Sequence, residues 1–291
     1  MPLIHSGPIG ERLSATHGKR TLRARYLPAI LISMIVVPML VILGFYAAVP
    51  AQALGPIAPT LGSAANFGVL GNSTVTNTGA TTHVYGDVGL STGTSVTGLT
   101  SGMVTGTFEV NNLTARQAQS ALALAYDDAA NRTLSPISVS GNLGGQTLVA
   151  GLYKSTSSLA VSSGDLTLSG SATDVWIFQI ASTLTLTVGR AVNLTGGAIS
   201  ANVFWQVGSS ATLGVNSTMS GTIMALASVT LNHGATLYGR ALARTGAVTM
   251  DTNTVVMPGS TVIPEFSQVL VPLIGMMFVI AIVSKVRNQK K

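Results

Sequence analysis

The segments ATLGVN, SVTLNH and AVTMDT, at residues 211–216, 228–233 and 247–252, place three threonines in register. Thr212, Thr230 and Thr249 are 18 and then 19 positions apart. A second ladder follows the first through STMSG (217–221), ATLYG (235–239) and TVVMP (254–258). A short period built from strand-like pieces is typical of a β-solenoid, in which each repeat is one coil and buries its apolar face by stacking on its neighbours. The pattern therefore predicts a solenoid with a row of threonines along one wall.

Alternation within each coil predicts which side chains face the lumen, because successive residues of a strand point to opposite faces of the sheet. The apolar parity is expected to fill the lumen, and it comprises Leu213, Val229, Leu231, Val248 and Met250. The other parity is expected to face outward, and it comprises Thr212, Gly214, Thr230, Asn232, Thr249 and Asp251.

The remaining strand of each coil has a different pattern. In VFWQV (203–207), TIMALA (222–227) and RALAR (240–244) both parities are apolar or small, which indicates a wall covered on both faces. We expect the cover to be a helix from Thr114 to about Asn131, begun by a capping box of Thr114 and Gln117. Its narrow apolar stripe contains Ala115, Ala118, Leu122, Ala125, Tyr126 and Ala129.

Composition restricts the class of partner. Charged residues are only 8% of the chain, and it has no cysteine, which excludes disulfides and thiolate metal sites. The formal net charge of +6 is concentrated at the two ends. Between Leu54 and Ile263 there are seven acidic and six basic residues, so this domain lacks the basic footprint of a nucleic-acid-binding protein.

Both ends of the chain carry membrane signals. Four basic residues between Lys19 and Arg25 precede an apolar run, 26–49, which is followed by the small-x-small pattern of Ala51-Gln52-Ala53. This predicts a secretory signal at residues 1–53, with an uncleaved N-terminal anchor as the alternative. A second apolar run, 269–283, is followed by four basic residues, which predicts a membrane helix whose tail stays inside while the solenoid lies outside.

The motif before the second run, Pro264-Glu265-Phe266, resembles the archaeal PEF-CTERM sorting signal. The resemblance implies that a membrane transpeptidase, an archaeosortase, removes the tail and attaches the protein to the cell surface. An ordinary C-terminal transmembrane anchor is the alternative. The expected organisation is a signal or anchor (1–53), a solenoid domain (54–257), a linker with the motif (258–266), and a transmembrane segment with a basic tail (267–291). The expected partners are thus the membrane, through both terminal segments, and the transpeptidase.

Residues 60–257 as a whole are similar to the large microbial ice-binding (antifreeze) protein family with a discontinuous β-solenoid. The phrases that carry the resemblance include LGSAANFGVLGNSTVTNTG (61–79), NLGGQTLVAGLY (142–153), NVFWQVGSSATLG (202–214) and GRALARTGAVTMDTNTV (239–255). The resemblance implies a mainly β, right-handed solenoid of triangular section with one long helix along one wall. It also implies an N-terminal coil segment that lies beside the C-terminal coils, and a flat outward wall that binds ice.

Of the two walls that the helix leaves free, the threonine-bearing wall is the more regular. Earlier strands extend it, through TLTLT (183–187) and SLAVS (158–162). The other wall is expected to be rougher, because Tyr238 and Met219 interrupt it. The predicted ice-binding residues are Ser158, Ala160, Ser162, Thr185, Thr187, Thr212, Gly214, Thr230, Asn232, Thr249 and Asp251.

Two other function classes compete with this reading. A surface adhesin would use the same flat wall to hold glycan or mineral. A polysaccharide-acting solenoid enzyme would need carboxylates that converge in a groove, but Asp127 and Asp128 are adjacent on a helix and the other aspartates are scattered. His83 and His233 are isolated, so we expect neither a metal site, nor a cofactor, nor enzymatic activity.

Five N-x-S/T sequons occur in the expected solenoid, and in an exported protein such asparagines are acceptors for glycans. A glycan on the ice-binding wall would prevent flat contact with a crystal. Modified asparagines are therefore expected at corners or on the other walls. The five are Asn72, Asn112, Asn131, Asn193 and Asn216.

Overall fold

The structure is a computed structural model that describes residues 55–259. The predicted N-terminal signal or anchor, the Pro264-Glu265-Phe266 motif and the C-terminal apolar segment lie outside the described residues. Within 55–259, no helix combines the length and the apolar character needed to cross a membrane. The described chain is mainly β, with one α-helix and three short 3₁₀ helices, η1 (Gly62–Asn66), η2 (Ser101–Met103) and η3 (Ser200–Asn202).

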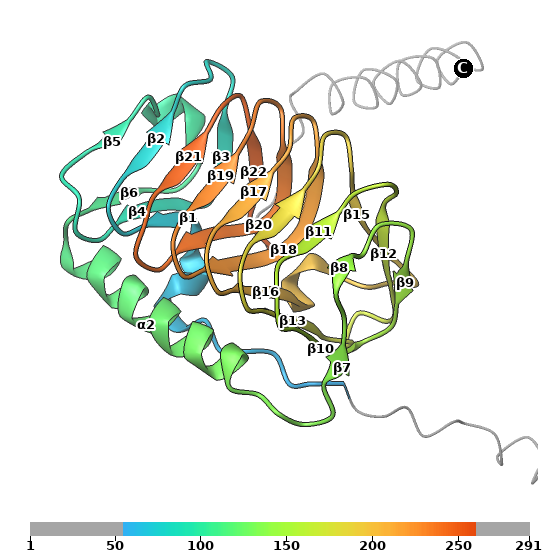
Figure 1. Cartoon of the computed structure of the whole chain (residues 1–291). Helices are drawn as coiled ribbons and strands as arrows, with labels where there is room; N and C mark the ends of the chain where they lie inside the picture. Colours follow the sequence, from blue (N-terminus) through green and yellow to red (C-terminus); the bar gives the residue numbers. More distant parts are fainter. Residues whose placement is uncertain (1–54, 260–291) are drawn as a thin grey trace, which may run out of the picture. The chain divides into compact units, whose positions relative to one another are not determined.

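The strands pair in parallel and form three walls, which the chain visits in turn (Figure 1). The first, here called the helix-covered wall, contains in spatial order β6 (Phe108–Val110), β4 (Asp87–Leu90), β1 (Phe67–Gly71), the second half of β20 (Thr236–Ala243), the second half of β18 (Thr218–Ala225), β16 (Val203–Val207), β13 (Trp176–Ile180), β10 (Gly151–Ser155) and β7 (Ile137–Ser138).

The second, here called the threonine wall, contains in spatial order β5 (Val96–Thr97), β2 (Val75–Asn77), β21 (Val248–Met250), β19 (Val229–Leu231), β17 (Ala211–Leu213), β14 (Leu184–Leu186), β11 (Leu159–Val161) and β8 (Gly141–Asn142). The third wall contains β3 (His83–Tyr85), β22 (Thr254–Val256), the first halves of β20 and β18, and a separate sheet of β15 (Val192–Thr195), β12 (Leu166–Ser169) and β9 (Thr147–Leu148).

The expected parity is confirmed on the threonine wall. β17 and β19 alternate buried, half-buried and buried residues, and β21 alternates buried, exposed and buried. Leu213, Leu231 and Met250 are at most 1% exposed and join one apolar cluster that fills the lumen. Burying this continuous apolar column is the main stabilising contribution that stacked coils make.

Aromatic rings support the lumen beneath the helix-covered wall. Tyr153, Phe178 and Trp205 occupy matching positions on β10, β13 and β16. Their ring centroids are 5.1 Å and then 3.9 Å apart, with nearly parallel planes. Stacked aromatic pairs add about 0.5–1.5 kcal/mol each beyond the burial of area.

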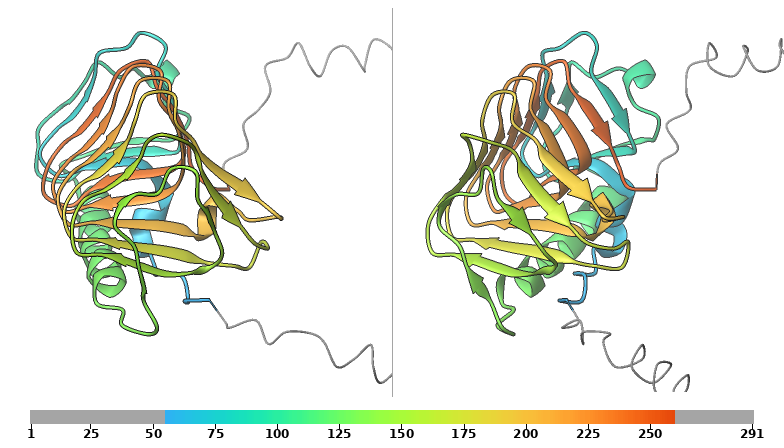
Figure 2. Two further views of the ribbon diagram at one scale, coloured as in Figure 1. Left: turned by 45° about the vertical axis from the view of Figure 1, so that its right-hand side comes forward. Right: turned by 90° about the vertical axis from the view of Figure 1, so that its right-hand side faces the viewer.

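The order of coils in space differs from their order in the sequence. The N-terminal strands β1, β2 and β3 pair with β20, β21 and β22, which are the last strands of the described chain. In Figure 2 the blue-to-cyan N-terminal strands accordingly lie beside the red C-terminal ones. This confirms the arrangement implied by the resemblance, and it makes the coil stack dependent on contacts between the two ends of the domain.

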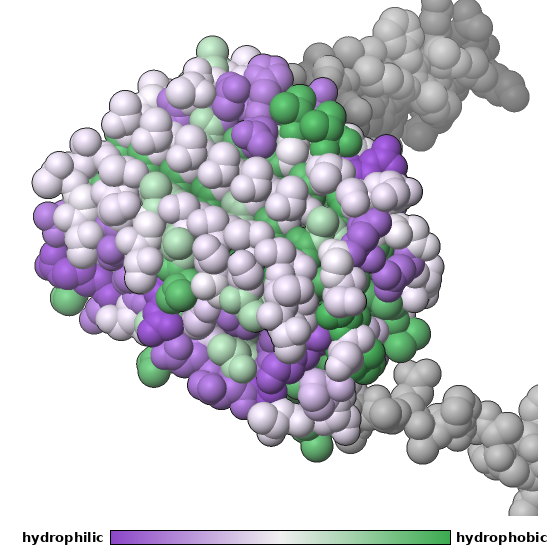
Figure 3. Space-filling view, in the orientation of Figure 1, coloured by the Kyte–Doolittle hydropathy of each residue, from purple (hydrophilic) through white to green (hydrophobic). Residues whose placement is uncertain are grey.

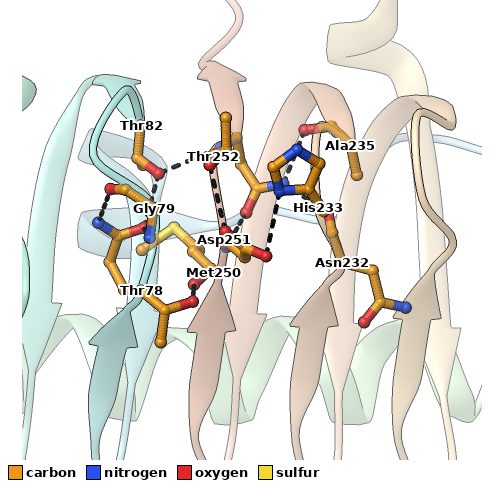
Figure 4. A network of polar contacts seen from close by, with 11 residues as sticks. Thr78, Gly79, Thr82, Asn232, His233, Ala235, Met250, Asp251 and Thr252 are labelled. Carbon is orange, nitrogen blue, oxygen red and sulfur yellow. Dashed lines mark hydrogen bonds and ion pairs between the residues drawn. The ribbon is translucent and has the colours of Figure 1, made fainter.

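Two buried asparagines, Asn77 and Asn253, join these ends at a corner of the stack. Figure 4 labels three residues that they contact, Thr82, Asn232 and Ala235. The Asn253 carboxamide is fully buried and donates to the carbonyl oxygens of Asn232 (2.8 Å) and Ala235 (3.0 Å). The Asn253 backbone N–H donates to the Thr82 hydroxyl, which in turn donates to Oδ1 of Asn77. Polar groups buried in this way stabilise a fold only when they are paired, so this corner depends on its particular side chains.

The helix α2 (Leu113–Ala130) packs on the outer face of the helix-covered wall. Its buried residues are those of the predicted stripe, Ala115, Ala118, Leu122, Ala125, Tyr126 and Ala129. The predicted capping box is wrong: the N-cap is Asn112, whose side chain accepts from the Ala115 N–H at 2.9 Å. Asparagine is a stronger N-cap than threonine, and here the helix begins earlier than the apolar stripe indicated.

Polar contacts also tie the helix to the wall. The Gln206 carboxamide donates to the Tyr126 hydroxyl (2.8 Å), and Gln179 donates to the carbonyl of Ala129 (2.8 Å) at the helix C-terminus. Arg240 is 8% exposed and donates to the Ala65 carbonyl (2.9 Å) at the end of η1. Burial lowers the pKa of Arg240 to about 10, so it remains a cation at neutral pH.

Candidate functional site

The threonine wall carries a longer row of threonines than the sequence pattern indicated. Thr185, Thr212, Thr230 and Thr249 are aligned on consecutive strands, as predicted. The N-terminal strands add two more, because Thr76 of β2 is aligned with Thr249 and Thr97 of β5 is aligned with Thr76. We call this set the threonine row: Thr185, Thr212, Thr230, Thr249, Thr76 and Thr97.

Thr76 and Thr97 were missed, although a local signal for them exists. Thr74-Val75-Thr76 and Ser95-Val96-Thr97 repeat the hydroxyl-Val-Thr pattern of Ser228-Val229-Thr230. At the other end the row continues to Ala160 of β11 and then to Asn142 of β8, so the predicted residue Ala160 occupies its expected column.

The hydroxyls of the threonine row are free of protein partners. Within residues 55–259, none of the six side chains forms a hydrogen bond, and all six are half-buried or exposed. Their partner must therefore be water or an external surface. The hydropathy surface over β2, β21, β19 and β17 is accordingly pale, neither strongly polar nor strongly apolar (Figure 3).

In the column on one side of the row, the hydroxyl side chains form hydrogen bonds within the protein. The Ser228 N–H donates to the Ser210 hydroxyl (3.3 Å), and the Ala247 N–H donates to the Ser228 hydroxyl (3.1 Å). At the far end of this column, the Thr183 hydroxyl donates to Oγ of the predicted residue Ser158 (2.8 Å). These side chains bridge neighbouring coils and form an edge of the wall.

The column on the other side of the row lies at a corner. The strands end at Val161, Leu186, Leu213, Leu231 and Met250, so the predicted residues Ser162, Thr187, Gly214, Asn232 and Asp251 each follow a strand end. Thr187 uses its hydroxyl to donate to the Val161 carbonyl (3.1 Å). Side chains alternate between the lumen and the outer face only within a strand, so this alternation does not place residues where the chain turns.

Gly214 shows the consequence, because it is buried rather than outward-facing as predicted. A Cβ at this position would lie 2.7 Å from the backbone atoms Thr187 C and Val188 N of the next coil. That approach is too close for any side chain. Gly214 therefore allows two coils to meet at the corner, and it offers no group to the outer surface.

Asp251 is paired with a histidine at the same corner (Figure 4). Its Oδ2 lies 3.2 Å from Nδ1 of His233, and the two side chains are 40% and 60% exposed. The Asp251 backbone N–H donates to Oδ1 of Asn253. Asp251 thus joins the corner network at the junction between the two ends of the domain through its backbone, while its carboxylate is paired with His233 beside the threonine row.

The third wall offers a shorter alternative. Thr218, Thr236 and Thr254 are aligned on β18, β20 and β22, but His83 continues their column on β3. Tyr238, beside them, is 47% exposed. The expectation that Met219 also interrupts this wall is wrong: it is 1% exposed and points into the lumen.

Three of the aspartates form ion pairs on the surface. Asp127 pairs with Arg244 (2.7 Å) and Asp128 pairs with Arg132 (2.7 Å), both on the surface of α2. Asp165 lies 3.6 Å from Arg190 at a corner. Nowhere in 55–259 do three or more His, Cys, Asp or Glu residues gather as metal ligands would.

Comparison with known proteins gives a consistent result. The model of a family described as Ice-binding-like matches residues 69–256. The ice-binding protein of Nostoc sp. (strain HG1) is 46% identical over 198 residues, which are 67% of this chain and 72% of that protein. The ice-binding protein of Flavobacterium frigoris (strain PS1) is 38% identical over 216 residues, covering 68% and 76% of the two chains.

A solved structure shares the arrangement of strands and helix. The crystal structure of an ice binding protein from an Antarctic biological consortium superposes with a TM-score of 0.68 at 52% sequence identity. The match covers 72% of this chain and 96% of that one.

Proposed function

The chain belongs to the Ice-binding-like family, and from this premise we propose that it adsorbs to ice through the threonine wall and thereby inhibits ice growth or recrystallisation. The observation that carries the proposal is the threonine row itself, with six aligned hydroxyls that have no partner within residues 55–259. The other two walls are less suitable. One is covered by α2, and on the third a column of three aligned threonines ends at His83 and lies beside the protruding Tyr238.

The spacing of the wall explains how it holds water. Neighbouring strands of a parallel sheet lie about 4.8 Å apart, and alternate outward residues of one strand lie roughly 6.6–7 Å apart. The wall therefore presents methyl and hydroxyl groups on a regular two-dimensional lattice. Methyl groups keep water at a fixed distance, whereas hydroxyls anchor it with hydrogen bonds that are nearly as favourable as direct protein contacts. Waters ordered in this way join the crystal lattice and stop its growth locally.

The wall is rigid before it meets ice. Threonine is β-branched and has few rotamers, so little side-chain entropy is lost on contact. In the middle of the row, the residues that flank each threonine along its strand pack in the lumen; Val229 and Leu231, on either side of Thr230, are at most 1% exposed. The flanking serines bond to neighbouring coils and hold the strands in register.

We also propose the hand and the cross-section of the solenoid, and its location outside the cell. A right-handed winding of triangular section follows from the three parallel walls together with the preferred hand of parallel crossovers. Display outside the cell follows from the basic and apolar segments at both ends of the sequence, with the C-terminal motif recognised by a sorting transpeptidase. Protease added to intact cells should digest the solenoid, and its protection would contradict display.

Ice adsorption is tested with residues 54–260 in a nanolitre cell that holds one ice crystal. Faceting of the crystal and suppressed recrystallisation are expected. Growth indistinguishable from that in buffer would refute the proposal and would leave the adhesin reading, in which the same wall binds glycan or mineral.

A further inference from the structure

We propose that Asn193, on the third wall, is the acceptor of an N-linked glycan. The proposal adds a modification site to the chain. It shares with the proposed function only the premise that the domain is exported, and it is independent of ice binding. Among the five sequons, which all lie within residues 55–259, Asn193 alone combines three properties: a free carboxamide, an extended backbone and an accessible strand edge.

Two of the other asparagines use both carboxamide atoms in the fold. Nδ2 of Asn72 donates to the Thr245 carbonyl (3.1 Å), and its Oδ1 accepts from the Ser91 hydroxyl (2.7 Å). Asn112 is the N-cap of α2, and its Nδ2 donates to the carboxylate of Glu109. A glycan on either residue would disturb a turn or a helix start that the fold requires.

The next two sequons are held in unsuitable backbone or side-chain arrangements. Asn131 is the C-cap of α2, and its Nδ2 donates to the Asp127 carbonyl (2.8 Å). Asn216 has a left-handed backbone, with φ 54°. The middle residue of its sequon, Ser217, is 1% exposed and donates to the Gly214 carbonyl (2.7 Å), so this turn is locked.

Asn193 and Thr195, the two residues that define the remaining sequon, are both exposed. They lie two positions apart in β15, so their side chains share the outward face of the strand. Neither side chain forms a hydrogen bond to any residue in 55–259. The acceptor amide and the hydroxyl that a transferase must recognise are therefore presented together.

The strand itself is accessible on one side. β15 pairs with β12 along its length, in register Asn193 with Thr167. On its other side, contacts with β18 are confined to the start of β15: an isolated bridge joins Ala191 and Thr218, and the Ser220 hydroxyl donates to the Val192 carbonyl (2.9 Å). A transferase that binds an extended acceptor can reach such an edge without unfolding a coil.

The chemistry is a group transfer from a lipid-linked oligosaccharide phosphate or pyrophosphate. Nδ2 of Asn193 attacks the anomeric carbon, a C–N bond forms and the C–O bond to the phosphate breaks. The phosphate leaves with the electron pair, and Nδ2 loses one proton. The product places its sugar chain on the third wall, which contributes no residue to the threonine row, so flat contact of that row remains open.

The test is mass spectrometry of glycopeptides from the full chain, isolated from the surface of the cells that naturally make it. We expect a sugar mass on the peptide that contains Asn193, its loss in Asn193→Gln, and its retention in Asn216→Gln. Because Asn193 is exposed and unbonded, Asn193→Gln should keep its thermal stability and its ice activity.

A chain that reaches the cell surface with an unmodified Asn193 would overturn the glycan assignment. Display and ice binding would be unaffected by that result. Modification at Asn216 or Asn72 alone would also overturn it. Retention of the whole chain inside the cell would instead refute its display on the cell surface, and with it the glycan on Asn193. Ice shaping by the purified chain is measured separately, so a failure of ice binding is distinguishable from a failure of display or of glycosylation.

Discussion

Thr76 lies directly beside Thr249 in the threonine wall, although the two residues belong to opposite ends of the domain. The pairing extends the threonine row by two coils, since Thr97 follows Thr76 on the next strand. The proposed ice-contacting wall is therefore complete only when the N-terminal strands have docked on the C-terminal coil. The corner network of Asn77, Thr82 and Asn253 lies at the same junction.

Thr230→Tyr is expected to abolish most of the ice activity without unfolding the protein. Thr230 lies in the middle of the row and is half-buried, so a tyrosine ring there would protrude and hold the wall away from the crystal. Exposed substitutions usually change stability by no more than about 0.5 kcal/mol. Thermal hysteresis and thermal melting measure the two effects separately. Thr236→Tyr, on the third wall, is the control and should leave activity nearly intact; the opposite outcome would assign ice binding to the third wall.

Thr76→Tyr is expected to lower ice activity as Thr230→Tyr does, because Thr76 occupies the same row. Thr254→Tyr is the matched control, since Thr254 lies on β22 of the third wall, near the same junction. Full activity in Thr76→Tyr would show that the N-terminal coils only support the wall and do not touch ice.

Leu231→Asp is expected to unfold the coil stack. Leu231 is 1% exposed in the lumen, and an unpaired carboxylate there would cost about 4 kcal/mol or more. Thermal melting is the measurement. A melting temperature equal to that of the unaltered protein would show that the strand parity is misassigned.

Asn253→Ala is expected to destabilise the junction between the two ends of the domain. The substitution removes one of the two donors to each of the Asn232 and Ala235 carbonyls and leaves the Asp251 N–H without the Asn253 Oδ1 acceptor, which costs about 1–3 kcal/mol for a buried group. Urea unfolding gives the free energy directly. Asn193→Ala, at an exposed and unbonded position, should change it by less than about 0.5 kcal/mol; equal effects of the two substitutions would contradict the role of the corner network.

Stability should fall as the pH rises above about 10. Burial raises the pKa of Tyr126 above its ordinary value of 10.0. In that range the unfolded chain has lost the tyrosine proton while the folded chain retains it, so raising the pH favours unfolding. Urea unfolding between pH 9 and 11 should show this slope, and Tyr126→Phe should reduce it. Tyr238→Phe, at an exposed position, is the control, and a slope that Tyr126→Phe leaves unchanged would assign the effect to another group.

Local periodicity was enough to predict much of this protein. Thr212, Thr230 and Thr249 are in register, Leu213 and Leu231 face the lumen, and one narrow stripe of α2 is buried, all as the sequence pattern indicated. These features depend on which residues alternate along a strand or recur along a helix, and that information is contained in neighbouring positions of the chain.

Other features were decided by tertiary structure alone. Gly214 is buried because the next coil approaches it at the corner, and the N-cap of α2 is Asn112 because its side chain reaches the Ala115 N–H. Thr76 and Thr97 joined the row only through pairing between distant segments. A strand has no partner until the chain has folded, so the extent of a flat wall made from many short strands is a property of the stacked coils and not of any one segment.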